Sequence, residues 1–340
     1  MVEVSGGEPR PEVHTISVVI PVYQGERTLR GVVDELAAYF EPVLTPAGHA
    51  LQVTEILLAY DNGPDGSDEV IRKLAALIPQ VRPVWLSRNF GQHAATIAGM
   101  ASSGGDWIVT MDEDGQHDPA YLPEMLDTAM RERAGVVYAQ PTNSAPHGFA
   151  RNLASRGAKW VVRHWMRGMD VSSFQSYRFM LGEVGRSVAA YAGAGVYLDV
   201  ALTWVNGRMA QQPVALRAEN DRPSGYDTRT LLSHFWRLVL TSGTRGLRLV
   251  SVLGVTFAVL GFLLAIWTII GRLSGDTGQP GWASVLVMVS LGTGAVLFSL
   301  GVVAEYVGVA VNQAMGRPLF LIHSDPLDGP LGRGRPSPDA

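Results

Sequence analysis

The sequence of 340 residues contains no cysteine. This absence excludes disulfide bonds, thiolate–zinc sites and a cysteine nucleophile, and it fits a reducing compartment. The formal net charge is only −4, which gives no electrostatic footprint for nucleic acid, so we expect no nucleic-acid partner. At this length the chain has room for one large domain or two smaller ones.

Charged side chains are also absent from two long runs, residues 249–271 and 277–304. The first spans 23 residues. As a helix that length is about 34 Å, enough to cross a hydrocarbon core of about 30 Å. The alternative for such runs is a pair of buried core helices. We predict transmembrane helices over 247–271 and 281–306, joined into a hairpin by a short link.

The residues beside these runs predict how the chain is oriented in the cell membrane. Arg245 and Arg248 precede the first run and Arg317 follows the second. By the positive-inside rule, both termini and the bulk of the chain lie in the cytoplasm. Residues 1–14 are polar without an apolar core, so we expect a disordered lead and no signal peptide. The Gly- and Pro-rich end predicts a flexible cytoplasmic tail over 318–340.

The remainder of the chain lacks the usual nucleotide-binding glycine motifs. A dinucleotide site would show G-x-G-x-x-G after the first strand, but "PVYQGERT" has one glycine, so NAD is not expected. No G-x-x-x-x-G-K-[ST] motif occurs, which excludes a P-loop.

Short β-branched apolar runs instead alternate with segments of helical periodicity. This alternation predicts a doubly wound, mostly parallel α/β sheet. We expect strands over 16–23, 53–60, 81–87 and 106–112, and helices over 28–40, 67–78 and 91–103.

Polar residues follow each of these predicted strands. They are Tyr23 to Glu26, Asp61–Asn62, Arg88–Asn89 and Asp112 to Asp114. Ligands of such sheets bind beyond the carboxyl ends of the strands, so we expect these residues on one rim. The alternative for Arg88–Asn89 is a solvated turn.

The stretch "MDEDGQHDP" places four carboxylates within seven positions after an apolar run. Asp118 followed by Pro119 is an ordinary helix start. Asp112 and Asp114, however, repel each other unless a cation lies between them. Carboxylates at a strand end can hold Mg²⁺ or Mn²⁺. The alternative is a solvated acidic loop.

Four stretches occur in a set order: "SVVIPVYQGERTL", "LLAYDNGPDGS", "LSRNFGQHAATIAGM" and "MDEDGQHDP". Together they resemble the GT-A glycosyltransferases of family 2. With "RPSGYDTRTLL" and the C-terminal hairpin, they resemble the polyprenyl-phosphate glycosyltransferases, which include dolichol-phosphate mannosyltransferase and the bacterial undecaprenyl-phosphate transferases. The resemblance covers roughly residues 15–320. It implies a GT-A catalytic domain over 15–227 and an amphipathic juxtamembrane segment over 228–246.

The resemblance implies a nucleotide-sugar donor, linked to UDP or GDP, and a divalent metal, Mg²⁺ or Mn²⁺. The family element D-x-D-x-Q is matched by Asp112, Asp114 and Gln116, which would hold the metal against the donor diphosphate, with Asp114 as a catalytic residue. Asp61 would read the base. The implied nucleotide-sugar-binding residues are Pro21, Tyr23, Glu26, Asp61, Arg88, Asn89, Asp112 and Glu113.

The implied acceptor is a polyprenyl phosphate such as undecaprenyl or decaprenyl phosphate, and the lipid-linked product would serve cell-envelope glycosylation. A phosphate monoester has a second pKa of about 6, so at neutral pH it is mostly a dianion that needs no general base. In-line attack would invert the anomeric centre. Arg178 is the best candidate for aiming the phosphate, as a catalytic group and an acceptor contact. The other candidate contacts are Arg151, Arg222, Ser224 and Tyr226.

The sequence also departs from the family pattern. The family element D-D-G-S-x-D is shortened here to "DNGPD", and Ser176 stands where an Asp is expected. These departures keep open a non-catalytic GT-A-like membrane scaffold, or a transferase for another lipid or for a polysaccharide. His93 and His117 are interpreted as ordinary polar residues. The family commonly forms tetramers, so a homo-oligomer is expected by resemblance, while the sugar and the base stay open.

Overall fold

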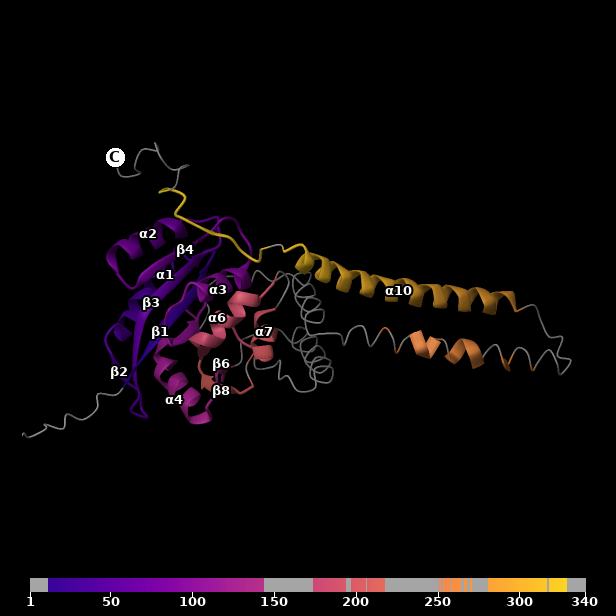
Figure 1. Cartoon of the computed structure of the whole chain (residues 1–340), viewed down its shortest axis with the longest axis horizontal. Coiled ribbons are helices and arrows are strands. Elements are labelled where there is room, and N and C mark those ends of the chain that lie inside the picture. The colour runs from indigo at the N-terminus through magenta and orange to yellow at the C-terminus, as the bar shows by residue number, and fades with distance from the viewer. Residues whose placement is uncertain are drawn as a thin grey trace, which may run out of the picture. The chain divides into compact units, whose positions relative to one another are not determined.

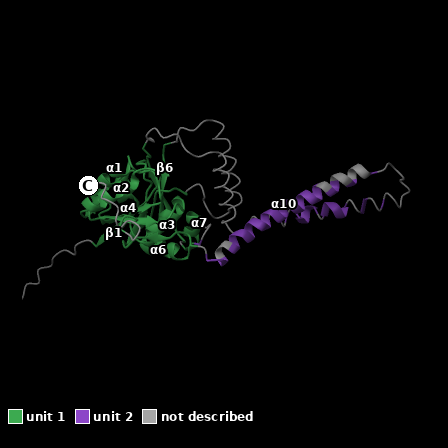
Figure 2. Cartoon of the chain, turned by 90° about the horizontal axis from the view of Figure 1, so that it is seen from above, with its two compact units in different colours: residues 1–192, 196–225, 318–340 green, residues 193–195, 226–317 purple. Residues whose placement is uncertain are grey.

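The structure is a computed structural model that divides into two compact units, shown in Figure 2. Unit 1 comprises residues 1–192, 196–225 and 318–340, and unit 2 comprises residues 193–195 and 226–317. The residues that the structure describes are 12–143, 174–193, 197–205, 207–217, 281–316 and 318–328, with separate positions between 250 and 270.

Unit 1 is built on a mixed β-sheet (Figure 1). Its strands are β1 (Val13–Val22), β2 (Val43–Leu44), β3 (Ala50–Tyr60), β4 (Val81–Leu86), β5 (Trp107–Thr110), β6 (Val136–Pro141), β7 (Arg178–Leu181), β8 (Met209–Val214) and β9 (Ile322–His323). Their order is β8-β6-β7-β5-β1-β3-β4-β9, and β2 pairs with β3 outside this path. The centre β5-β1-β3-β4 is parallel, as predicted, whereas β7 runs antiparallel between β5 and β6.

Helices cover both faces of this sheet. They are α1 (Leu29–Leu36), α2 (Ser67–Leu77), α3 (Gln92–Ala101), α4 (Leu122–Glu132), α6 (Gly182–Tyr191) and α7 (Leu198–Val205), with short 3₁₀ turns η1 (Ala37–Tyr39) and η2 (Pro119–Tyr121). One buried cluster joins α1, α2 and α4 to one face, and a second joins α3, α6 and α7 to the other. On β1, Val18 belongs to the first cluster and Val19 to the second, because successive side chains of a strand point to opposite faces.

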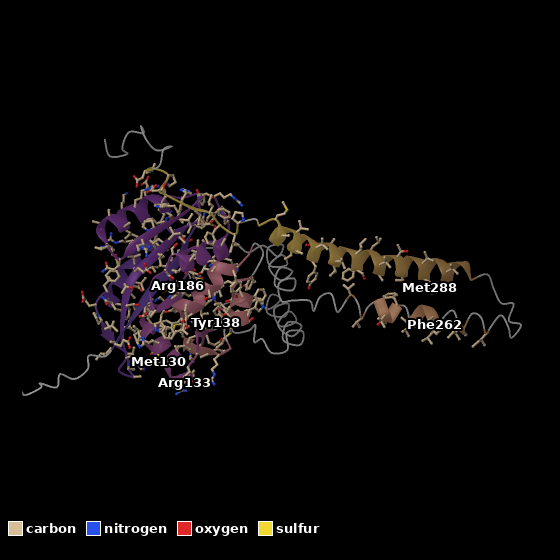
Figure 3. The ribbon with its side chains drawn as sticks, viewed as in Figure 1. Met130, Arg133, Tyr138, Arg186, Phe262 and Met288 are labelled. Atoms are coloured by element: carbon tan, nitrogen blue, oxygen red, sulfur yellow. The ribbon has the colours of Figure 1, made fainter. Side chains whose placement is uncertain are left out.

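The helix boundaries follow local chemistry. Asp118 caps η2 by accepting the backbone N–H of Ala120 at 2.9 Å, as the sequence predicted. The helix α4 ends where Arg133 takes the left-handed φ of 50°. The chain then enters β6, whose Tyr138 is buried. Figure 3 labels Arg133 and Tyr138 at these two places.

Residues 318–328 contradict the prediction of a flexible tail over 318–340. The strand Ile322–His323 pairs antiparallel with the edge strand β4, and Figure 1 shows this yellow segment running beside β4. Asp325 forms an ion pair with Arg72. The prediction failed because a two-residue strand has no periodic pattern of its own and depends on an edge far away in the sequence.

Unit 2 contains α10 (Trp282–Ala314), which extends past the predicted end of the second span at 306. Within it, Leu291–Val311 is long and apolar enough to cross a membrane. Phe262 and Met288, both labelled in Figure 3, are exposed apolar side chains of unit 2.

Much of the predicted membrane part lies beyond the described residues. The juxtamembrane segment over 228–246 lies outside them entirely. Of the predicted first span over 247–271, only separate positions are described. The two-helix hairpin and the interfacial segment therefore stay predictions.

Candidate active site

The sheet order puts the loops after β5, β1, β3 and β4 next to one another in this order. The sequence predicted that the residues after these strands share one rim of the sheet, without predicting a strand order. Glu113 ties two of these loops together. Its carboxylate oxygens accept the backbone N–H groups of Tyr23 and Gln24, each at 2.9 Å. Glu113, predicted as a donor-binding residue, therefore fixes the β1 loop against the β5 loop.

Asp61 at the end of β3 ties down a third loop. Its buried carboxylate accepts the backbone N–H groups of Phe90 and Gly91, each at 2.7 Å. Burial raises the pKa of Asp61, and the two amide hydrogen bonds act in the opposite direction. Asp61 thus fixes the loop between β4 and α3, which carries Arg88 and Asn89. Its predicted role in reading the base stays a prediction.

Gly63 allows the β3 loop to approach the β1 loop closely. A Cβ atom added at Gly63 would lie 1.6 Å from the carbonyl oxygen of Tyr23, which is backbone and cannot rotate away. Any side chain at this position must therefore separate the two loops. The close approach fixes where Tyr23, a residue that is 43% exposed, lies on the rim.

We expect Gly63→Ala to destabilise unit 1 by about 1–3 kcal/mol, as overpacking does, and to weaken nucleotide binding. Thermal unfolding and equilibrium binding of UDP and GDP measure the two effects. The matched control is Gly31→Ala in α1, where an added Cβ meets nothing within 4 Å and helix propensity favours Ala. A Gly63→Ala protein as stable as the control would contradict the close contact.

Asp112 is held by side chains from two further segments. Its Oδ1 accepts the Gln92 Nε2–H of α3 at 2.7 Å, and its Oδ2 accepts the Ser176 hydroxyl at 2.6 Å. Its own backbone N–H donates to His117 Nδ1 at 3.0 Å. The carboxylate of Asp112 is 26% exposed. It is therefore oriented by these hydrogen bonds and still accessible to solvent. Ser176 therefore donates a hydrogen bond to Asp112, where an Asp would bring a second negative charge.

Asp114 continues this loop with one carboxylate oxygen turned back on the chain. Its Oδ1 accepts the backbone N–H of Gln116 at 3.0 Å, and Gly115 between them has a φ of 78°. That left-handed conformation favours glycine and lets the chain reverse.

The donor set of this loop fits a hard divalent cation. Carboxylate oxygens suit Mg²⁺ and Mn²⁺. Within the part of the chain that the structure describes, no group of three or more His, Cys, Asp or Glu side chains is placed to hold a metal.

His117 packs beneath the loop that follows β5 and bonds to the backbone of Asp112. Its ring is buried and stacks on Tyr177, with 4.9 Å between the ring centroids. Burial lowers the pKa of His117 against the opposing effect of Asp112. Because Nδ1 accepts a hydrogen bond, the proton of the neutral ring is on Nε2. His117 is thus a packed polar residue, as the sequence interpretation had it.

Arg178 lies in β7 with its guanidinium buried and held by four hydrogen bonds. It donates to both carboxylate oxygens of Asp199, at 2.6 and 2.9 Å, and to the hydroxyl of Thr110 and the carbonyl of Ser176, at 3.2 Å each. Burial alone would lower the pKa of Arg178, but Asp199 outweighs it and the pKa is raised. The hydroxyl of Tyr138 donates to the same Asp199 at 3.0 Å.

The prediction that Arg178 aims the acceptor phosphate stays a prediction. Arg178 is 4% exposed and bonded to Asp199 through Nε and Nη2, so contact with an acceptor phosphate would require this pair to open. The guanidinium instead holds the carbonyl of Ser176, whose hydroxyl holds Asp112. We therefore propose a positioning role for Arg178.

The other predicted site residues are distributed between the rim and the undescribed segments. Pro21 is buried in β1. Tyr23, Glu26, Arg88 and Asn89 are exposed on the rim loops. The candidate acceptor contacts Arg151, Arg222, Ser224 and Tyr226 lie outside the described residues.

Three residues that support the site were not singled out from the sequence. Gln92 and Asp199 are described above, and Arg217 donates its backbone N–H to Gln116 O at 3.1 Å and forms an ion pair with Asp118 at 2.9 Å. Asp199 had a readable signal, since a lone acid in the apolar stretch "VYLDVALTW" needs a buried partner. Arg217 had none, because its partners Gln116, Asp118 and Glu35 are all distant in the sequence.

Residues 17–184 match the family model described as glycosyl transferase family 2. The chain carries a family 2 glycosyltransferase domain. This finding confirms the family and the enzyme class that the sequence resemblance implied.

The chain is similar to two curated bacterial proteins, both named undecaprenyl-phosphate 4-deoxy-4-formamido-L-arabinose transferase. It is 27% identical to that of Aeromonas hydrophila, covering 92% of this chain and 94% of that protein. It is 29% identical to that of Pseudomonas aeruginosa, covering 93% and 91%. Among solved structures, glucosyl-3-phosphoglycerate synthase from Mycobacterium tuberculosis matches with 20% identity and a TM-score of 0.49, covering 68% of this chain and 80% of that one.

Proposed function

We propose that this glycosyltransferase moves a sugar from a nucleotide-diphosphate sugar to a polyprenyl phosphate at the cytoplasmic face of the cell membrane. The product would be a lipid-linked monosaccharide for cell-envelope glycosylation. The observation that carries the proposal is the loop of Asp112 and Asp114, with Asp112 oriented by Gln92 and Ser176 on the rim of the sheet. The names of relatives that match over nine-tenths of the chain support the acceptor.

The donor would bind along the rim. Asp112, Asp114 and Gln116 would hold a divalent cation, which when bound would offset the charge of the leaving nucleoside diphosphate. The nucleotide would contact Pro21, Tyr23 and Glu26 at the end of β1, where Glu113 fixes the loop to that of β5. It would also contact Arg88 and Asn89, on the loop that Asp61 fixes to the end of β3. Fixed loops are favourable here because transfer depends on the reacting atoms being aligned.

The acceptor chemistry is consistent with Ser176 in place of an acid. A phosphate monoester has a second pKa of about 6, so it reaches the site as a nucleophile already deprotonated. The protein has to tolerate its charge and aim its oxygen at the anomeric carbon. Arginines suit this through paired donors. In this proposal Arg151, Arg222, Ser224 and Tyr226 bind the acceptor phosphate. The reaction inverts the configuration at the anomeric carbon.

Membrane attachment follows from the lipid acceptor. The helix α10 has one stretch, Leu291–Val311, that can cross a membrane, and the predicted span over 247–271 would complete a hairpin with both termini in the cytoplasm. A homo-oligomer, a tetramer by resemblance, is part of the same proposal. The sugar, and the choice between UDP and GDP, are left to experiment.

The test is product formation by the full-length protein in detergent. Undecaprenyl phosphate, Mg²⁺ or Mn²⁺ and a panel of UDP- and GDP-sugars are supplied, and chloroform-soluble radiolabelled product is measured. We expect product from one donor, and we expect EDTA to reduce it at least about a hundredfold, because the donor diphosphate and the carboxylates repel without a cation. Added Mn²⁺ should restore it.

Undecaprenol and diacylglycerol serve as matched acceptor controls, since both are lipids without a terminal phosphate. Product from either would replace the polyprenyl-phosphate proposal with transfer to a hydroxyl. Nucleotide binding without product from any donor would point to a donor outside the panel. Absence of both nucleotide binding and product would favour the non-catalytic scaffold.

A further inference from the structure

The segment that follows α10 in the chain returns to unit 1 and packs on it. Leu319 and Phe320 lie against the buried cluster on the α3 face of the sheet. The strand Ile322–His323 then extends the sheet beside β4. We call residues 319–325 the return segment.

The return segment contacts the β4 end at the point where the strand becomes the rim loop. The N–H of Ser87 donates to the carbonyl of Leu321 at 3.0 Å. The carbonyl of Leu86 lies 3.1 Å from His323 Nε2 and accepts Asn62 Nδ2–H at 2.5 Å. One backbone carbonyl is therefore shared between the return segment and the β3 loop.

An ion pair anchors the far end of the return segment. Arg72 donates from Nε and Nη2 to the two carboxylate oxygens of Asp325, at 2.7 and 3.0 Å. The side chains are 24% and 12% exposed, so the pair is partly shielded from solvent. Burial acts to raise the pKa of Asp325, but the bonds from Arg72 outweigh it and lower the pKa. This two-point contact is the stronger form of an arginine–carboxylate pair.

Arg72 is also connected to the β3 loop through a series of contacts. Its guanidinium carbon lies 5.0 Å from the ring centroid of Trp85. Trp85 meets Tyr60 edge to face with 5.5 Å between centroids, and the hydroxyl of Tyr60 donates to the carbonyl of Gly63 at 3.1 Å. Asp325 and Arg72 therefore support the loop that carries Asp61.

The rim loop between β4 and α3 is thus held from two sides. Asp61 holds Phe90 and Gly91 from the β3 side, while the return segment holds Leu86 and Ser87 from the other. The residues between these fixed points are Arg88 and Asn89, the proposed donor contacts.

We propose that the return segment positions Arg88 and Asn89 for the nucleotide of the donor, with Asp325 and His323 as positioning residues. This inference rests on the proposed function, because it needs a nucleotide at the rim. A segment that only covered the edge strand β4 would protect it from pairing with other chains and would have no effect on donor binding. The proposed positioning role does predict such an effect.

The experiment compares Asp325→Ala with Asp328→Ala in the full-length protein. Asp328 is the same residue type, three positions beyond the return segment, and is exposed. For Asp325→Ala we expect the Kd for UDP or GDP with Mn²⁺ and the KM for the donor to rise about fivefold. The apparent affinity falls in proportion to the fraction of molecules whose loop is in the binding-competent position. The kcat at saturating donor and the KM for undecaprenyl phosphate should stay within about twofold. Asp328→Ala should behave as wild type, and Asp325→Glu should restore part of the loss.

Hydrogen exchange reports the loop directly. The amide of Ser87 should exchange faster in Asp325→Ala and not in Asp328→Ala. If Asp325→Ala does not fold, His323→Phe gives the same test, since it keeps a flat ring and removes the contact with the carbonyl of Leu86.

The two possible failures are distinguishable. A wild-type protein that binds neither nucleotide removes the proposed function and this inference together. A wild type that binds and transfers, with Asp325→Ala and His323→Phe matching it in donor KM, overturns the inference alone. Equal rises in the KM values for donor and lipid would also overturn it, because that indicates general loosening of unit 1.

Discussion

Replacing Asp114 with Asn should lower kcat/KM for sugar transfer by about 10²–10³-fold, which is about 3–4 kcal/mol of transition-state stabilisation. The substitution keeps an oxygen in place and removes the negative charge that a divalent cation needs. Stability should change little, because Asp114 is partly exposed and the remaining carbonyl oxygen can still accept the N–H of Gln116. Initial rates with radiolabelled donor, at several Mn²⁺ concentrations, measure the effect.

Asp112→Asn should have an effect of the same size. Gln92 and Ser176 both donate to Asp112, and an Asn can satisfy both, because the serine hydroxyl can turn to accept from the new amide. The fold should therefore persist while the charge is lost. The control is Asp34→Asn on the exposed face of α1, where the ion pair with Arg30 is open to solvent and should matter little. If both loop variants kept wild-type rates, the metal assignment would have to be abandoned.

The sequence predicted the centre of the fold well because that part is governed by local patterns. Apolar runs, helical periodicity and the cap at Asp118 all act within about ten residues, and the parallel centre of the sheet follows from them. The antiparallel β7 and the strand Ile322–His323 depend on pairing between distant segments, which local patterns do not contain. The resemblance supplied the identity of the rim residues.

The sequence did not show which of its candidate site residues also hold other parts of the chain. Glu113 and Asp61 were predicted to bind the donor, which stays a prediction, and the structure adds that their carboxylates accept backbone N–H groups of neighbouring loops. Motifs identify which positions matter, whereas hydrogen-bond partners show how each acts. The same distinction applies to Arg178.

We expect Asp199→Ala to destabilise unit 1 by about 3–5 kcal/mol, because it leaves the buried charge of Arg178 without its partner. The unfolding midpoint of the detergent-solubilised protein should fall by about 10 °C. The comparison is Glu132→Gln, which breaks an exposed ion pair with Arg131 and should shift the midpoint very little. An unchanged midpoint for Asp199→Ala would mean that the pair contributes nothing to the fold.

A triple variant, Tyr138→Phe, Arg178→Met and Asp199→Leu, separates positioning from acceptor binding. It removes the charges together with the hydroxyl that donates to Asp199, and replacing a buried ion pair by apolar groups is often neutral or stabilising. We expect most of the stability to return and the KM for undecaprenyl phosphate to stay near the wild-type value. A stable triple variant that binds donor but shows a KM for the lipid raised at least about tenfold would instead show that Arg178 leaves Asp199 to bind the phosphate, since losing a charged contact costs that much.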